Sequence, residues 1–290
     1  MHNASPAEMS AKPTDGDVIP LEERHLDQAL EQSQRLSWPY RLEDWAFALK
    51  LGRGFAIELD GRLAGTALWW PYGKDFASAG MIIVANEAQR KGIGARLMAA
   101  LLADAAGRRI ILNSTQEGRA LYTRLGFAPY DTLHQHQAVL AEAPSLDRTV
   151  PLRAATSNDR DALIELDRAA SGMDRTALFD ALSAIGDIMV ISRDDRVTGY
   201  GCVRKWGRGV VIGPVVAHDV IDAKALISAL AARHVGEFVR IDVTVSCGLS
   251  PWLETIGLPR TDDALCMSLG EPPQFDPDVT LYALSNQSLG

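Results

Sequence analysis

The chain has 290 residues, which is long for one domain and sufficient for two domains that each bury a core. An apolar content of 47% and a charged content of 23% are ordinary for a globular protein. The formal net charge of −8 argues against a nucleic-acid partner, because nucleic-acid-binding proteins usually present a basic face. An acidic balance is compatible with a cationic small-molecule or peptide substrate.

The cysteines and the apolar runs indicate a cytoplasmic protein without a membrane partner. Cys202, Cys247 and Cys266 are widely spaced and odd in number, which is typical of neither a disulfide framework nor a zinc site. No apolar run approaches the roughly 18 residues of a membrane helix. Residues 1–17 are polar and lack the apolar region of a signal peptide, so we expect a disordered tail there.

The first half of the chain is predicted to alternate strands and helices. In chain order we expect a strand at 18–21, helices at 26–36 and 42–49, strands at 55–59, 62–70 and 81–84, a helix at 93–105, a strand at 110–113, a short helix at 120–125 and a closing strand at 133–140. This order predicts a mixed α/β (α+β) layer rather than a doubly wound Rossmann sheet.

The pattern then repeats after a linker over 141–150. Three pairs of segments match in order at nearly constant offset, namely 60–65 with 194–199, 84–85 with 216–217, and 121–127 with 252–258. We therefore expect a duplicated fold, with one domain at 18–143 and another at 150–270. The extension at 271–290 carries prolines, and either a closing strand or a loose end is compatible with it.

A glycine-rich turn between a predicted strand and a predicted helix is a candidate anion site. Free backbone N–H groups and the helix dipole attract anions to a helix N-terminus. In Gln89-Arg90-Lys91-Gly92-Ile93-Gly94, the glycines remove side chains, so that a pyrophosphate can approach, and Arg90 and Lys91 add positive charge. The spacing fits neither the P-loop nor the dinucleotide motif. An ordinary glycine-containing helix start is the structural alternative.

These residues resemble the GNAT superfamily of acetyltransferases. Residues 89–94 match its Gln/Arg-x-x-Gly-x-Gly/Ala signature, and Leu-Tyr-Thr-Arg-Leu-Gly-Phe at 121–127 resembles its short helix and turn. The stretch 52–140, with 38–45 before it, is similar to a bacterial subgroup that carries a degenerate second GNAT-like domain. The resemblance implies two tandem GNAT-like folds, each a mixed, mostly antiparallel sheet flanked by helices.

The resemblance also implies acetyl-CoA as cosubstrate, with no metal. The family's fourth strand binds the pantetheine, and the signature turn binds the pyrophosphate. The cofactor residues implied are Ile82, Ile83, Val84, Gln89, Arg90, Lys91, Gly92, Ile93, Gly94, Thr115 and Gly118. Tyr122 matches the family's general acid, which protonates the departing sulfur; a core tyrosine that packs beneath the cofactor is the alternative.

The general base is not indicated by the sequence. An alkyl amine with a pKa of about 10.4 is almost entirely protonated at neutral pH, and many family members use a strand carboxylate to help. The segments 79–84 and 110–113 contain no carboxylate or histidine. Glu43, Asp44, Asp75 or a chain of water molecules are the candidates, although each carboxylate is more typical of a solvated charge.

For the acceptor, aromatic and polar residues before and within the first domain are candidates, because aromatic faces attract cations. The residues that we expect there are Trp38, Tyr40, Asp44, Trp70 and His134. Buried tryptophans of an ordinary core are the alternative for at least two of the nearby tryptophans. His134 and His136 share one strand face but lack a third ligand, so we expect no metal site.

The second half serves as an internal comparison. Aligned with Gln89, Gly92 and Gly94 are Ile221, Lys224 and Leu226, and Leu253 aligns with Tyr122. We therefore expect a fold without cofactor chemistry that completes the acceptor pocket or mediates association, such as a homo-oligomer.

Together these features predict an acyl-CoA N-acyltransferase. It would move an acetyl group to a primary amine of a small molecule, or less expectedly of a peptide or protein, by direct attack in a ternary complex. A non-catalytic CoA-binding sensor or scaffold is the main alternative, and a protein that binds a different anion is another.

Overall fold

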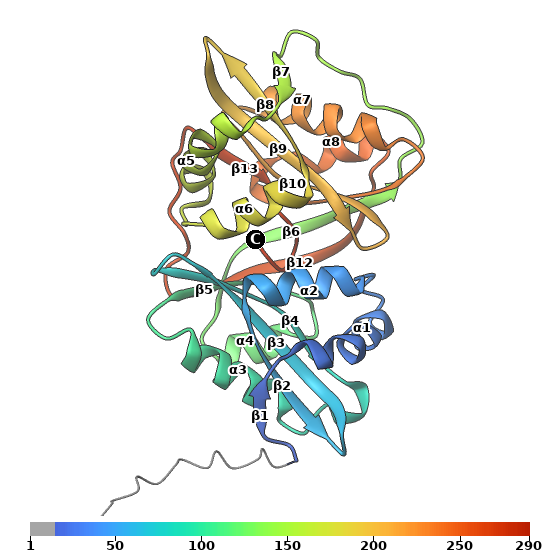
Figure 1. Cartoon of the computed structure of the whole chain (residues 1–290), viewed down its shortest axis with the longest axis vertical. Helices are drawn as coiled ribbons and strands as arrows, with labels where there is room; N and C mark the ends of the chain where they lie inside the picture. The colour runs from blue at the N-terminus through green and yellow to red at the C-terminus, as the bar shows by residue number, and fades with distance from the viewer. Residues whose placement is uncertain (1–14) are drawn as a thin grey trace, which may run out of the picture.

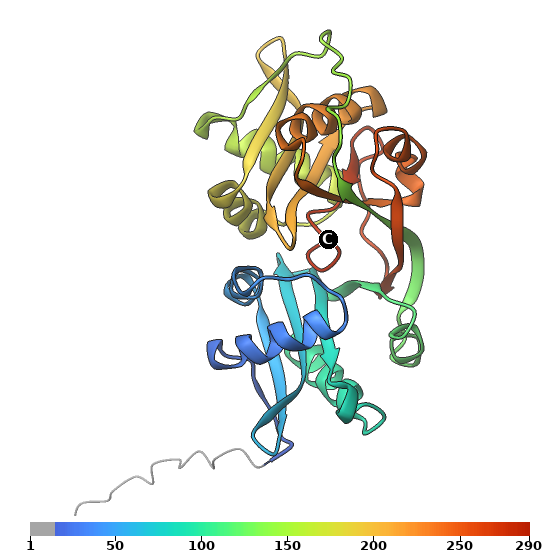
Figure 2. The same ribbon diagram turned by 90° about the vertical axis from the view of Figure 1, so that its right-hand side faces the viewer.

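The computed structural model describes residues 15–290. Figures 1 and 2 show two lobes, each with helices packed against strands, and the C-terminus between them. The expected mixed α/β fold is confirmed, since one mostly antiparallel sheet runs through both lobes with helices on its faces. Residues 1–14 lie outside the described part of the chain. Asp15–Asp17 belong with the fold, because the Gly16 amide donates to the Glu58 carbonyl at 2.9 Å.

Every element predicted for the first half is present. Its helices and strands are β1 (Val18–Pro20), α1 (Leu26–Arg35), α2 (Leu42–Leu51), β2 (Arg53–Leu59), β3 (Arg62–Tyr72), β4 (Phe76–Val84), α3 (Ile93–Asp104), β5 (Arg109–Ser114), α4 (Arg119–Arg124) and β6 (Ala128–Val139). β4 begins five residues earlier than expected, because a tight turn with Gly73 at φ +62° pairs Tyr72 with Phe76.

The second half repeats this order. Its helices and strands are β7 (Leu152–Ala154), α5 (Arg160–Ser171), α6 (Thr176–Ile185), β8 (Asp187–Arg193), β9 (Arg196–Trp206), β10 (Gly209–Ala217), α7 (Val220–Ala231), β11 (Phe238–Thr244), α8 (Ser250–Thr255) and β12 (Arg260–Leu269). One further strand, β13 (Thr280–Ala283), pairs with β10, so part of the extension at 271–290 packs as a strand.

The two halves exchange strands at the centre of the sheet. The order there is β5-β12-β6-β11, so each half contributes a strand that lies between two strands of the other. The expectation that 133–140 closes the first-half sheet is therefore corrected: β6 has β12 and β11 as neighbours, while β5 pairs with β12. Alternating burial identifies a strand but not its partner, which explains the difference.

The exchanged strands carry a hydrogen-bond network whose proton positions are determined. His136 is fully buried; its Nδ1 lies 2.8 Å from the Leu258 carbonyl, which can only accept, and its Nε2 lies 2.8 Å from Ser250 Oγ. Ser250 then donates to His136 and accepts from His134 Nδ1 at 2.8 Å. The His136 ring carries its proton on Nδ1 and is neutral in this arrangement, and a second proton on Nε2 would disrupt it.

We expect this network to make the protein less stable in mild acid. Burial lowers the pKa of His136, with smaller effects from the Leu258 carbonyl and from His134, Glu254 and Arg260. The unfolded chain, with a histidine pKa of about 6.5, therefore binds more protons, so stability falls as pH drops through 6.5. Urea unfolding at pH 8 and pH 5.5 checks this. The loss should shrink in His136→Gln and persist in His218→Gln, a change at an exposed ring.

Candidate active site

A cleft opens where β4 and β5 separate. The two strands pair in parallel from Phe76 with Arg109 to Ala79 with Leu112, and the pairing ends there. β4 carries an extra residue at this point: Met81 has φ +51°, and its carbonyl accepts the Thr66 hydroxyl at 2.8 Å. A cavity of about 980 Å³ lies along the separated edge. The β4 backbone from residue 80 to 84 therefore lines an open space instead of a strand.

The N-terminus of α3 borders the same cavity. Gly92 is its N-cap with φ +76°, and Arg90 has φ +61°, so the turn exposes the first amides of the helix. A Cβ at Gly92 would meet no other atom of the described chain within 4 Å, so the space beside this glycine is open, and its φ is one that other residues rarely adopt. At Gly94 a Cβ would lie 3.4 Å from Leu121 and 3.6 Å from Val84.

Most of the residues predicted to bind the cofactor lie together on this cavity. Ten of them line it: Ile82, Ile83, Val84, Gln89, Arg90, Gly92, Ile93, Gly94, Thr115 and Gly118. Lys91 is exposed and is not among the lining residues. Arg90 and Arg124 supply positive charge near the α3 N-terminus, where a phosphate would need it.

Tyr122 on α4 also lines the cavity. Its side chain is 8% exposed and meets Phe127 edge-on at 5.9 Å between ring centres. Burial raises the pKa of Tyr122 well above its ordinary value, so the phenol stays protonated and can donate. Among residues 15–290 no hydrogen-bond partner of its hydroxyl is found. A Cβ at Gly118 would lie 2.6 Å from the Tyr122 ring, so Gly118 makes room for this side chain.

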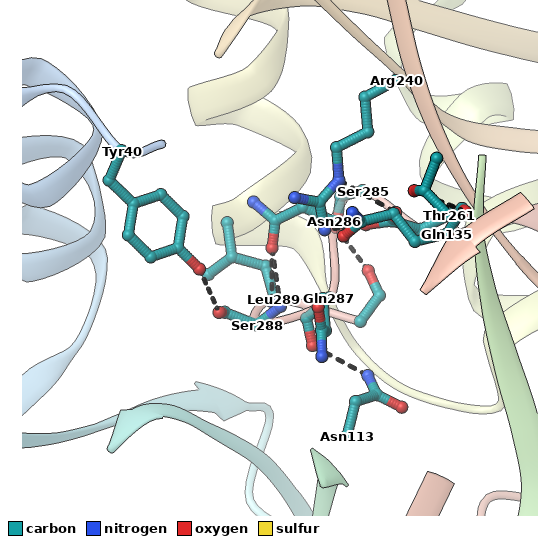
Figure 3. Close-up of polar contacts among 12 residues, drawn as sticks. Tyr40, Asn113, Gln135, Arg240, Thr261, Ser285, Asn286, Gln287, Ser288 and Leu289 are labelled. Carbon is teal, nitrogen blue, oxygen red and sulfur yellow. Dashed lines mark hydrogen bonds and ion pairs between the residues drawn. The ribbon is translucent and has the colours of Figure 1, made fainter. Parts of the chain in front are cut away.

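The far end of the cavity is built from both halves. Trp38 and Tyr40 line it from the segment before α2, and Tyr40 Oη lies 3.1 Å from Ser288 Oγ (Figure 3). Other lining residues come from four adjacent strands and from the chain after β13: Asn113, Gln135, Gln137, Arg240, Thr261, Asp262, Gln287 and Ser288. Sequence reasoning missed these eight, because the strand exchange and the return of the chain bring them together.

Three residues expected at the acceptor site lie elsewhere, which corrects that prediction. Asp44 is 1% exposed and binds the Arg41 guanidinium and the Gly207 amide, at 2.6 and 2.8 Å. Trp70 is 2% exposed and donates to the Ala48 carbonyl at 2.8 Å. His134 belongs to the network around Ser250. Glu43 and Asp75, both exposed, are not lining residues either.

The corresponding region of the second half is filled by the chain itself. β10 and β11 pair from Val210 with Val239 to Ile212 with Ile241, and β13 then occupies the place beside Val215–Ala217. At the N-terminus of α7, the Asp219 carboxylate accepts the amides of Ile221 and Asp222, each at 2.9 Å. An anion would therefore meet a fixed negative charge at the second helix.

Within residues 15–290 the structure contains neither a group of metal ligands nor a membrane-spanning helix. No group of three or more histidine, cysteine, aspartate or glutamate side chains there is arranged to hold a metal ion. Within the same range, no helix is long and apolar enough to cross a membrane.

Comparison with known proteins agrees with this geometry. The model of the acetyltransferase (GNAT) family matches residues 20–127, and that of an acetyltransferase (GNAT) domain matches residues 163–283. The chain therefore belongs to the GNAT acetyltransferases, with two domains in tandem, and it is an acyltransferase.

Two curated relatives match almost end to end. An uncharacterized N-acetyltransferase of Bacillus subtilis is 26% identical over 280 residues, covering 94% of this chain and 98% of the relative. Holothin acyltransferase from a Pseudoalteromonas species is 27% identical over 269 residues, covering 86% and 90%.

Solved structures share the fold. A putative acetyltransferase from Pyrococcus horikoshii superposes with a TM-score of 0.79 at 19% identity, covering 99% of this chain and all of the other. A tandem GNAT protein from the clavulanic acid biosynthesis pathway gives a TM-score of 0.63 at 16% identity, covering 87% and 98%.

Proposed function

We propose that the first-half cleft transfers an acetyl group from acetyl-CoA to a primary amine of a small molecule, by direct attack in a ternary complex. One observation carries this proposal: a single cavity joins the unpaired edge of β4, the N-terminus of α3 and the Tyr122 hydroxyl. These features suit, respectively, the pantetheine, the pyrophosphate and the sulfur of the cosubstrate.

Each feature would have a distinct task. The α3 amides and Arg90 hold the pyrophosphate, and the β4 backbone hydrogen-bonds the pantetheine. Fixing both reactants in the cleft accounts for much of the rate, since proximity contributes about 7–11 kcal/mol. The neutral amine nitrogen bonds to the thioester carbon, the carbon–sulfur bond breaks, and Tyr122 donates its proton to the leaving thiolate.

The amine proton would leave through water. The carboxylates that line the cavity are Glu117 and Asp262. Hydrogen bonds from its own backbone and from Thr115 lower the pKa of Glu117, which makes it a weaker base. Asp262 is exposed at the rim, on β12. We therefore expect the proton to reach solvent through water molecules that enter the open acceptor end.

The relatives favour a small-molecule acceptor. One is named for acyl transfer to holothin, and a structural neighbour is described as part of clavulanic acid biosynthesis. The acceptor end of this chain is a concave cleft bordered by Tyr40, the four strands and the chain end, which suits a compact amine better than a protein surface.

A screen of primary amines tests the proposal. Thiol release from acetyl-CoA, followed with a disulfide reagent, should rise with at least one amine. Tyr122→Phe should then lower kcat by about tenfold or more, because the thiolate would leave without a proton. Tyr130→Phe, at a phenol on β6 that is 43% exposed, should leave kcat unchanged. Tight acetyl-CoA binding with no turnover in any amine would favour the sensor or scaffold.

A further inference from the structure

Asn113 occupies a distinctive place in the cleft. It follows Leu112, the last β5 residue that pairs with β4, so it stands where the two strands separate. Successive residues of a strand face opposite sides of the sheet. Leu112 packs in the core beside α3, whereas Cys266, the cross-strand partner of Asn113, packs with Leu284. Asn113 therefore faces the acceptor side, toward residues 284–290, which we name the C-terminal segment.

The C-terminal segment fixes the orientation of the Asn113 amide. Asn113 Nδ2 donates to the Gln287 carbonyl at 2.8 Å (Figure 3). A carbonyl can only accept, so the amide nitrogen must face it and the two ends of the amide cannot be exchanged. Asn113 Oδ1 consequently points away from the segment. This oxygen is buried and has no hydrogen-bond partner within residues 15–290.

The segment itself is firmly held by the first half. Ser78 Oγ donates to the Ser288 carbonyl at 2.8 Å, and the Tyr72 hydroxyl donates to the Leu289 carbonyl. Within the segment, Asn286 Oδ1 accepts the amides of Ser288 and Leu289, each at 2.8 Å, which fixes its local shape. A Cβ at Gly80 would lie 3.0 Å from Ser288, so the segment packs directly against the separated part of β4.

A buried acceptor without a partner is costly, and because Asn113 is a residue that lines the cavity, a ligand there can supply the missing donor. We propose that Asn113 Oδ1 accepts an N–H of the acceptor amine, turns the nitrogen lone pair toward the thioester carbon, and is held in that orientation by the C-terminal segment of the second half. An amide oxygen is too weak a base to take the proton, so its role is orientation. This inference rests on the proposed function.

The test measures binding and needs no identified acceptor. The probes are CoA and two conjugates, S-(N-propylcarbamoylmethyl)-CoA and its ester analogue S-(propoxycarbonylmethyl)-CoA. The amide conjugate carries an N–H near the position of the attacking nitrogen, whereas the ester lacks it. Calorimetry of the full chain should show the amide binding about tenfold more tightly than the ester.

Variants separate the possible outcomes. Asn113→Leu should remove the preference for the amide conjugate. Binding of plain CoA to this variant reports whether the cleft of the variant is folded. Asn113→Ala provides the same test if a leucine side chain does not fit. Gln32→Leu is the matched control and should keep the preference. Gln32 also has a buried oxygen without a partner within residues 15–290, and its Nε2 donates to the Leu63 carbonyl, but it is not among the residues that line the cavity.

The role of the segment has its own variant. Ser78→Ala removes the hydroxyl that holds the Ser288 carbonyl, and should lower the amide preference about two- to threefold. An unchanged preference there would refute positioning by the segment. A preference that survives in Asn113→Leu, or that is absent in the wild type, would overturn the role of Asn113. Failure of the wild type to bind any of the three probes would instead refute the proposed function.

Discussion

Gly92→Glu should abolish acetyl-CoA binding, with an affinity loss of at least about a hundredfold. The glutamate would place a negative charge at the α3 N-terminus, where like-charge contact with a phosphate costs several kcal/mol. The change also strains the backbone, because Gly92 has φ +76°. Isothermal titration of acetyl-CoA into the wild type and the variant measures both affinity and stoichiometry.

Gly107→Glu is the control for backbone strain. Gly107 follows α3, has φ +85°, and a Cβ there would meet nothing within 4 Å, so its geometry matches that of Gly92. It lies outside the cavity lining, and we expect wild-type affinity. The wild type should bind one acetyl-CoA per chain, because β13 and Asp219 occupy the second cleft. Two sites per chain would contradict this reading of the second half.

The two halves should stay together after the chain is cut between them. A specific protease site inserted near Leu146, which is exposed in the linker, would separate residues 1–145 from the remainder. The exchange of β6 and β12 should hold both fragments, since each pairs with two strands of the sheet. Size-exclusion chromatography of the cut protein should give one species of unchanged mass that still binds acetyl-CoA.

Separate production of the halves supplies the contrast. In either half alone, a central strand would lose its neighbour from the other half, since β5 would lose β12 and β11 would lose β6. That strand would then form an open edge of the sheet. We expect such fragments to be insoluble or unfolded by circular dichroism. Two soluble, folded fragments that elute separately after cutting would show that the halves are independent domains and that the exchange contributes little to stability.

Because β6 and β12 are exchanged between the halves, the second half contributes residues to the cavity. β12 and β11 supply Asp262 and Arg240 to the acceptor end, and the C-terminal segment supplies Gln287 and Ser288. Arg240 is paired with Asp242 through bonds of 2.9 and 2.8 Å, and although burial disfavours its charge, Asp242 raises the pKa of Arg240. This pair adds no net charge to that end of the cavity.

The sequence by itself determined the elements of the first half, the repetition of their pattern in the second half, and the glycine turn and short helix that border the cleft. The residues from Gln89 to Gly94 and from Leu121 to Phe127 act locally, since a positive φ, a helix N-terminus and a short helix depend on near neighbours. The duplication was visible because the same strand and turn patterns recur at nearly constant offset.

Only the tertiary structure decided which strands are neighbours and what forms the acceptor end. Trp70, a tryptophan expected to line a pocket, is buried against α2, while Asn113, which follows the apolar residues 110–112 of β5, is one of the residues that line the cavity. A strand pattern has a period of two and records which face is buried, but not which of several similar strands lies beside it. Strand exchange and the return of residues 284–290 join groups far apart in the chain, and no local signal encodes that pairing.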